Sequence, residues 1–176
     1  IANKKYEIVE LKKKTIYSDY DKAIILHERR RAIMNSKNAF IEYDVDEISV
    51  EPEIFELNII SGGCHLYGYL LTPDKRIQGP YPTIIMSHGF PGYTTNNDLE
   101  LALMRMGCVV IHMNHRGAWG SEGNYLFTNL KDDLIAIAKW AHNPAIADQY
   151  DIDTENIFLV GHSMGGQTVL NAAKDL

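Results

Sequence analysis

The sequence predicts an α/β protein in which helices cover both faces of a mostly parallel sheet. From residue 83 onward, three nearly continuous apolar runs are typical of strands buried on both faces. Helix-like segments separate these runs, and this alternation of strand and helix builds a parallel sheet through right-handed crossovers. The runs are TIIMS (83–87), CVVIHM (108–113) and IFLV (157–160).

The charge distribution divides the chain near Lys37. Residues 1–37 carry ten lysines and arginines against five acidic residues, whereas the whole 176-residue chain has a net charge of −6. We therefore expect a basic, partly helical amino-terminal extension over residues 1–50 and a main domain over residues 51–176. The basic clusters KKK and ERRR of the extension indicate a solvated helix face or a salt-bridged arm in preference to a binding patch.

The expected elements begin with a helix over residues 18–34, for which Ser18 or Asp19 could serve as the cap. An acidic, β-rich stretch follows. In IFELNII (54–60), apolar and polar residues alternate, and HLYGYLL (65–71) follows across Ser61-Gly62-Gly63. This pattern predicts a hairpin of half-exposed strands.

Two further helices are expected between the buried strands. The first closes at Gly107, where a left-handed C-cap costs least, and the second ends before Asn143-Pro144. Each has apolar residues on one face at helical spacing. These residues are Leu99, Ala102, Leu103 and Met106 in the first helix, and Leu130, Leu134, Ile137, Ala138 and Ala141 in the second.

The stretch GHSMGG places Ser163 between a buried strand and a helix. A sharp turn at this place lifts the serine hydroxyl above the sheet, and the glycines Gly161 and Gly165 are needed because a Cβ atom would collide. The amide of Met164 would point from the new helix toward the place where an oxyanion forms. The alternative is an ordinary glycine-rich turn without catalysis.

A second motif, SHGFPG (87–92), follows the first buried strand and so emerges at the same edge of the sheet as Ser163. The three motifs HGFPG, NHRGAWGSEG and GHSMGG, in this order, resemble the α/β-hydrolase superfamily, especially its cinnamoyl-esterase-like and prolyl-oligopeptidase-like members. The resemblance covers about residues 54–176. It implies an α/β-hydrolase fold, truncated here after the helix that follows Ser163, and serine-hydrolase chemistry.

Carried over to this sequence, the resemblance assigns the nucleophile to Ser163 and the oxyanion hole to the backbone amides of Phe90 and Met164. Residues His88 and Gly89 match the turn that carries one donor, and His88 is structural in such folds. The residue before the nucleophile, His162, is expected to pack beneath the turn rather than act as a base.

Three more residues lie in or beside these motifs. A structural ion pair is favoured for Arg116 over substrate binding. Both Tyr93 and Trp119 could line an acyl or leaving-group pocket, and packing at its rim is an equal alternative. No metal-ligand spacing occurs among the seven histidines, and no cofactor is expected.

The sequence departs from the family's pattern after Ser163. In these enzymes an acidic residue and then a histidine follow the serine, but here only Asp175 and no histidine follow. Neither His88 nor His115 has an obvious carboxylate partner in the sequence. We therefore expect that the chain is the amino-terminal part of a longer hydrolase, that missing strands carry the acid and the histidine, and that these 176 residues alone are inactive.

The expected function is cleavage of carboxylic esters through an acyl-enzyme. A prolyl-oligopeptidase-type peptidase that acts on short peptides and a non-catalytic binding module are the alternatives. With a pI of about 5.6, the chain lacks the overall positive charge that attracts nucleic acid or anionic membranes. A small ester or a short peptide is therefore the expected partner. Two cysteines make no disulfide framework, and cytoplasm is the default location.

Overall fold

The computed structural model describes residues 52–75, 77–92 and 96–176. The expected helix over residues 18–34, the boundary near residue 50 and Tyr93 lie outside these ranges. The division into an extension and a main domain therefore stays a prediction. In the described ranges, no helix is both long and apolar enough to cross a membrane.

The predicted hairpin is present. Strands β1 (Ile54–Ser61) and β2 (Cys64–Leu71) pair antiparallel across a turn in which Gly62 and Gly63 have φ of 55° and 77°. Along β1, Leu57 and Ile59 are buried, whereas their neighbours Glu56, Asn58 and Ile60 are exposed. One face of the hairpin therefore packs on the core and the other faces solvent, as the alternating pattern predicts.

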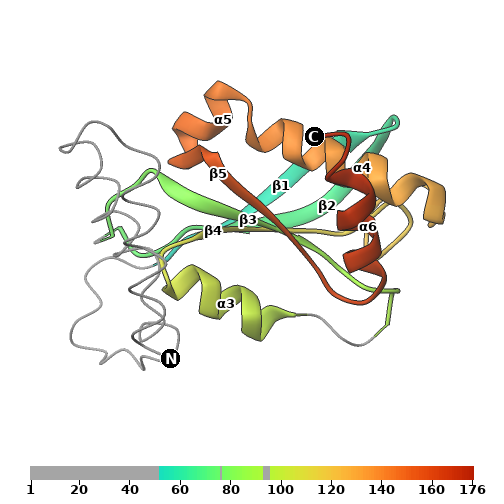
Figure 1. Ribbon diagram of the computed structural model, residues 1–176, viewed down its shortest axis with the longest axis horizontal. Helices are drawn as coiled ribbons and strands as arrows, with labels where there is room; N and C mark the ends of the chain where they lie inside the picture. The colour runs from blue at the N-terminus through green and yellow to red at the C-terminus, as the bar shows by residue number, and fades with distance from the viewer. Residues whose placement is uncertain (1–51, 76, 93–95) are drawn as a thin grey trace. The chain divides into compact units, whose positions relative to one another are not determined.

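The predicted parallel strands are also present. Strands β3 (Tyr81–Ser87), β4 (Val109–Met113) and β5 (Ile152–Gly161) run parallel, and the sheet has the order β1-β2-β4-β3-β5 (Figure 1). The hairpin joins this part through antiparallel pairing of β2 with β4. The result is a mixed sheet in which β3 and β4 are buried over their whole length.

Helices cover both faces of the sheet (Figure 1). On one face, α4 (Phe127–Ala141) lies beside α6 (Met164–Ala172), and all five apolar residues predicted for the buried side of α4 are buried. On the other face, α3 (Asn97–Arg105) packs against β4, and Gly107 just beyond it has a φ of 95°. A short helix, α5 (Pro144–Gln149), was not predicted, although Asn143 caps its start through a side-chain hydrogen bond.

The expectation that residues 157–160 are buried on both faces is wrong. Strand β5 lies at the edge of the five strands and pairs only with β3. The side chain of Phe158 is 50% exposed, and Leu159 and Val160 are only partly buried. An apolar run reports that a strand is suited to burial, but its neighbours in the sheet decide how much of it is covered.

Candidate active site

The site is built around the turn between β5 and α6. At this turn Ser163 has φ of 56° and ψ of −119°, a backbone conformation that L-residues other than glycine rarely adopt. Ser163 is exposed, and its hydroxyl makes no capping hydrogen bond to α6. The strained turn therefore leaves Ser163 exposed at the carboxyl end of a strand, and we call this turn, residues 161–165, the elbow.

Glycines allow this turn to form because they let three backbone segments meet. A Cβ atom on Gly161 would overlap the carbonyl of Gly165, and one on Gly165 would overlap the Ser87 carbonyl oxygen at the end of β3. The His162 amide donates to that same Ser87 oxygen at 3.2 Å. The elbow is therefore fitted directly onto the end of β3, which explains the glycines that the motif carries.

The two expected oxyanion donors flank the elbow. The residue Met164 is the first of α6, where backbone amides have no partner within the helix. The loop after β3 comes close from the other side, since an ideal Cβ on Gly89 would lie 3.3 Å from the Ser163 Cβ. The next residue, Phe90, has a side chain that is 67% exposed. The predicted donor residues thus lie on the two segments that adjoin Ser163.

The ring of His88 is engaged at both nitrogens and is buried. Its Nε2 accepts from the His115 amide at 3.1 Å, so its Nδ1 carries the proton and donates to the Gly89 carbonyl at 2.6 Å. Burial and the nearby His115 lower the pKa of His88 to about 4. A neutral ring with no free nitrogen ties the loop after β3 to the loop after β4, which is the structural role expected for it.

A second buried histidine, His115, has a carboxylate that sequence reasoning missed. Its Nδ1 lies 3.6 Å from Asp133 on α4, and its Nε2 lies 3.1 Å from the Ser87 hydroxyl. The expected ion pair of Arg116 is present as well, with its Nε 2.6 Å from Asp133. Because Nε2 faces Ser87 rather than Ser163, His115 is placed to hold β3, β4 and α4 together.

Neither His162, the residue before Ser163, nor Asp175, the last acidic residue, is placed as a catalytic partner of Ser163. Contrary to the expectation that it packs beneath the turn, His162 is exposed, because it directly follows β5, which is the edge strand of the described sheet. The carboxylate of Asp175 lies 2.8 Å from Lys131 on the surface of α4. Neither residue therefore forms a serine, histidine and acid chain with Ser163 in this part of the protein.

Aromatic side chains form a rim beside the elbow. The ring of Trp119, 39% exposed, packs edge-on to His88, with ring centroids 4.7 Å apart. The rings of Phe90 and Phe127 each pack edge-on to Tyr125. Sequence reasoning found Trp119 and Phe90 but missed Tyr125 and Phe127, whose only signal is their position between a motif loop and a helix start.

A buried polar network supports the base of this rim. The Glu100 carboxylate on α3 accepts from the Tyr69 hydroxyl and lies 2.6 Å from His112 Nδ1. The other ring nitrogen of His112 lies 3.2 Å from Asn114, whose amide donates to the Trp119 carbonyl at 3.0 Å. These bonds satisfy a buried carboxylate and fix the backbone at Trp119, where φ is 34°.

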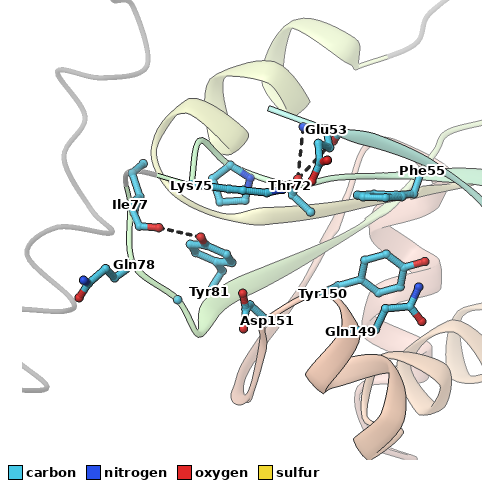
Figure 2. A pocket seen from close by; sticks show the side chains of 12 residues that line it. Glu53, Phe55, Thr72, Lys75, Ile77, Gln78, Tyr81, Gln149, Tyr150 and Asp151 are labelled. Carbon is cyan, nitrogen blue, oxygen red and sulfur yellow. Dashed lines mark hydrogen bonds and ion pairs between the residues drawn. The ribbon is translucent and has the colours of Figure 1, made fainter. Parts of the chain in front are cut away.

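Figure 2 shows a hollow of about 590 Å³, and Ser163 is not among the residues that line it. Its lining includes Tyr81 at the start of β3 and Tyr150 and Asp151 just before β5, so it adjoins the amino ends of these strands. Figure 2 shows the Tyr81 hydroxyl donating to the Ile77 carbonyl at its wall. Over the described ranges, no group of three or more histidine, cysteine or acidic residues could hold a metal ion.

Comparison with solved structures identifies the fold. A serine hydrolase without a lid from Xanthomonas campestris is 26% identical with a TM-score of 0.58, covering 70% of this chain and 57% of its own. Est1E from Butyrivibrio proteoclasticus, solved with ferulic acid, is 22% identical with a TM-score of 0.56, covering 66% of this chain and 46% of its own. The esterase Est22 is 20% identical with a TM-score of 0.59, covering 96% of this chain and 50% of its own.

The chain thus spans about half the length of the solved structures that it matches. A search of curated proteins gave no match. The family model and the matched fold define the class, a serine hydrolase of the α/β-hydrolase superfamily. Within it, the family model of the X-Pro dipeptidyl-peptidases (S15 family) matches residues 62–175, so the chain belongs to the S15 family.

Proposed function

We propose that this chain carries the nucleophile and the oxyanion hole of a serine hydrolase that cleaves carboxylic esters through an acyl-enzyme. The observation that carries the proposal is the strained, exposed Ser163 at the end of β5, with φ of 56°. Strain of this kind costs about 1–3 kcal/mol and persists where the surroundings enforce it, often at a functional site. The glycine contacts at Gly161 and Gly165 enforce it here.

In the proposed mechanism, the Ser163 oxygen attacks the ester carbonyl and the alcohol leaves, so that an acyl-serine forms. The amides of Phe90 and Met164 donate to the oxygen of the tetrahedral intermediate. Water then attacks the acyl-serine and releases the acid. Each donor comes from a segment that adjoins the elbow, which is the geometry that this step needs.

The proposal requires a base that takes the Ser163 proton. Both His88 and His115 have ring nitrogens directed to other partners, and His112 lies between Glu100 and Asn114. We propose that the whole protein supplies the histidine and its acid from outside the 176 residues. The lengths of the solved relatives support this, since this chain spans about half of each.

Peptide cleavage is the second candidate. The family match to X-Pro dipeptidyl-peptidases favours it, whereas esterases among the matched structures favour ester cleavage. The two candidates use the same residues of this chain. The full-length protein should therefore be assayed on short-chain aryl esters and on X-Pro dipeptide amides, and the higher kcat/KM identifies the substrate class.

The test of the nucleophile is substitution of Ser163. In the full-length protein a fluorophosphonate probe should label Ser163, and Ser163→Ala should abolish labelling and turnover because the catalytic residues act as a unit. Labelling at another serine, or undiminished turnover in the variant, would remove Ser163 from the mechanism. Absence of turnover on both substrate classes in a folded full-length protein would favour the binding module.

A further inference from the structure

We propose that Tyr125 is a positioning residue that holds the two oxyanion donors of this site at a fixed separation. The proposal rests on the function proposed above and adds to it a residue that no motif marks. It arises because Tyr125 contacts the side chains of both Phe90 and Met164. These two residues belong to segments far apart in sequence, and one ring bridges them.

The contact with Met164 is made by the tyrosine hydroxyl. This hydroxyl donates to the Met164 sulfur at 3.4 Å. Since Met164 is the first residue of α6, holding its side chain also limits rotation of the first helical turn, from which its amide projects. The tyrosine therefore acts on the donor that lies directly after the nucleophile.

The contact with the other donor segment is made by the ring. The rings of Phe90 and Tyr125 pack edge-on, with centroids 5.8 Å apart and an interplanar angle of 84°. The ring of His88 stacks on that of Tyr125 at an interplanar angle of 26°, with centroids 6.4 Å apart. Because His88 bonds the carbonyl of Gly89, the residue before Phe90, two contacts converge on the same peptide segment.

The tyrosine is itself fixed in place. The backbone at Tyr125 packs so closely against Gly117 that a Cβ there would overlap the Tyr125 nitrogen, and Gly117 has φ of 75°. The residue before Gly117, Arg116, is bonded to Asp133 on α4, and α4 begins two residues after Tyr125. An anchored aromatic ring loses little entropy on holding its neighbours, which suits it to positioning.

Removal of this ring should therefore affect the transition state more than substrate binding. A donor displaced by about 1 Å can cost roughly 10²-fold in rate, and loss of a donor costs about 10²–10³-fold. We expect Tyr125→Leu to lower kcat by about 10- to 100-fold and to leave KM within about twofold. The affinity for a boronic acid, which mimics the tetrahedral intermediate, should fall by the same factor as kcat/KM.

The experiment compares Tyr125→Leu, Tyr125→Phe and Tyr150→Phe in the full-length protein on a short-chain aryl ester. The phenylalanine variant keeps the ring and should retain more kcat than the leucine variant. The matched control is Tyr150→Phe, because this tyrosine packs with Phe55 and Trp140 near the amino end of β5, away from the elbow. A raised KM with unchanged kcat in Tyr125→Leu, or unchanged kinetics and boronate affinity, would overturn the proposal.

A stability measurement separates this proposal from the proposed function. If the wild type hydrolyses neither substrate class, the function has failed, and a double-mutant cycle of Tyr125→Phe and Met164→Leu in thermal unfolding still tests the contact. Non-additive changes in the free energy of unfolding would support the bridge between the tyrosine and α6. Additive changes would overturn it, whatever the activity.

Discussion

The backbone of Ser163 is held in an unfavourable conformation by contacts that only glycine permits. Its φ of 56° would relax if α6 could move away from β3, but Gly165 lies directly on the last residue of β3. The lack of a Cβ atom at Gly161 and Gly165 is therefore as necessary for this turn as the serine itself is for its proposed chemistry. This accounts for the spacing of the motif in physical terms.

Substitution of Gly165 should consequently disable the elbow. In Gly165→Ala, the new methyl group would overlap the Ser87 carbonyl, so we expect loss of fluorophosphonate labelling and a destabilisation of about 1–3 kcal/mol. Thermal unfolding and the labelling rate of the full-length variant measure both effects. The matched control is Gly92→Ala, whose nearest atom lies 3.8 Å away, and equal behaviour of the two variants would contradict this account.

The proposed role of Phe90 belongs to its main chain. Phe90→Leu keeps the amide and loses only the ring contact with Tyr125, whereas Phe90→Pro also removes the amide. The proline variant should therefore lose about 10²-fold or more in kcat, and the leucine variant should lose markedly less. Circular dichroism of both variants controls for folding. Similar kcat values in the two folded variants would exclude this amide from the oxyanion hole.

For single residues, the sequence predicted those that lie in a recognisable motif, but not the contacts between residues that are far apart in the sequence. The glycine pattern around Ser163 predicts a tight turn because a Cβ atom at Gly161 or Gly165 would overlap backbone atoms. Tyr125 contacts Met164, which is 39 residues away in the sequence. Asp133 on α4 likewise lies close to His115, which precedes it by 18 residues. No local spacing reports such contacts.

Among the elements, α4 combines a packing face with a polar anchor. Its apolar residues were predicted from their period, but the same buried side also holds Asp133, which is fully buried. Burial alone would raise the pKa of Asp133, yet its interactions with His115, Ser61 and Arg116 outweigh burial and hold this pKa below its usual value. The carboxylate is thereby kept charged between the helix and the loop after β4.

The depressed pKa of Asp133 predicts a pH-dependent contribution to stability. A group whose pKa is lower in the folded state stabilises the protein above its unfolded pKa, near about 4, and this stabilisation is lost as the pH falls through the folded pKa. We expect Asp133→Asn to lower the free energy of unfolding by about 3–5 kcal/mol at pH 7, since it leaves Arg116 without its charge partner.

This difference between Asp133→Asn and the wild type should shrink as the pH falls from 5 toward 2. Urea unfolding of the full-length protein at several pH values measures it. The neighbouring exposed residue supplies the control, because Asp132→Asn makes the same chemical change outside the ion pair. A difference that is constant with pH would show that the charge of Asp133 does not contribute.

In the part of the chain that the structure describes, the five-stranded sheet leaves β5 at one edge, with its apolar side chains partly uncovered. The exposed fraction is 50% for Phe158 and 76% for Leu170 on the adjoining helix. The apolar run at residues 157–160 correctly predicted a strand, but its order in the sheet is set by pairing across the fold. Sequence periodicity carries no information on that order.

This edge predicts the behaviour of residues 1–176 expressed alone. A strand whose outer edge has no partner strand in the described ranges, beside exposed apolar side chains, invites pairing with another copy, so we expect self-association and no esterase turnover. Light scattering measures the mass in solution. The variant Leu170→Lys should reduce association, whereas the control Leu101→Lys on α3 should not. A monomeric fragment with Ser163-dependent turnover would contradict this expectation. In that case His88 and His115 would be the first candidates for the base.

The loop between β4 and α4 has a consequence for how substrates enter. Arg116 fastens it to α4, Ser121 bonds both the Asn114 carbonyl and the Tyr67 amide, and Tyr125 reaches α6. A segment tied at three points along its length cannot swing open on the microsecond timescale of mobile lids without breaking these bonds. For the site proposed above, we therefore expect this side to act as a fixed wall whose aromatic residues are in place before a substrate arrives.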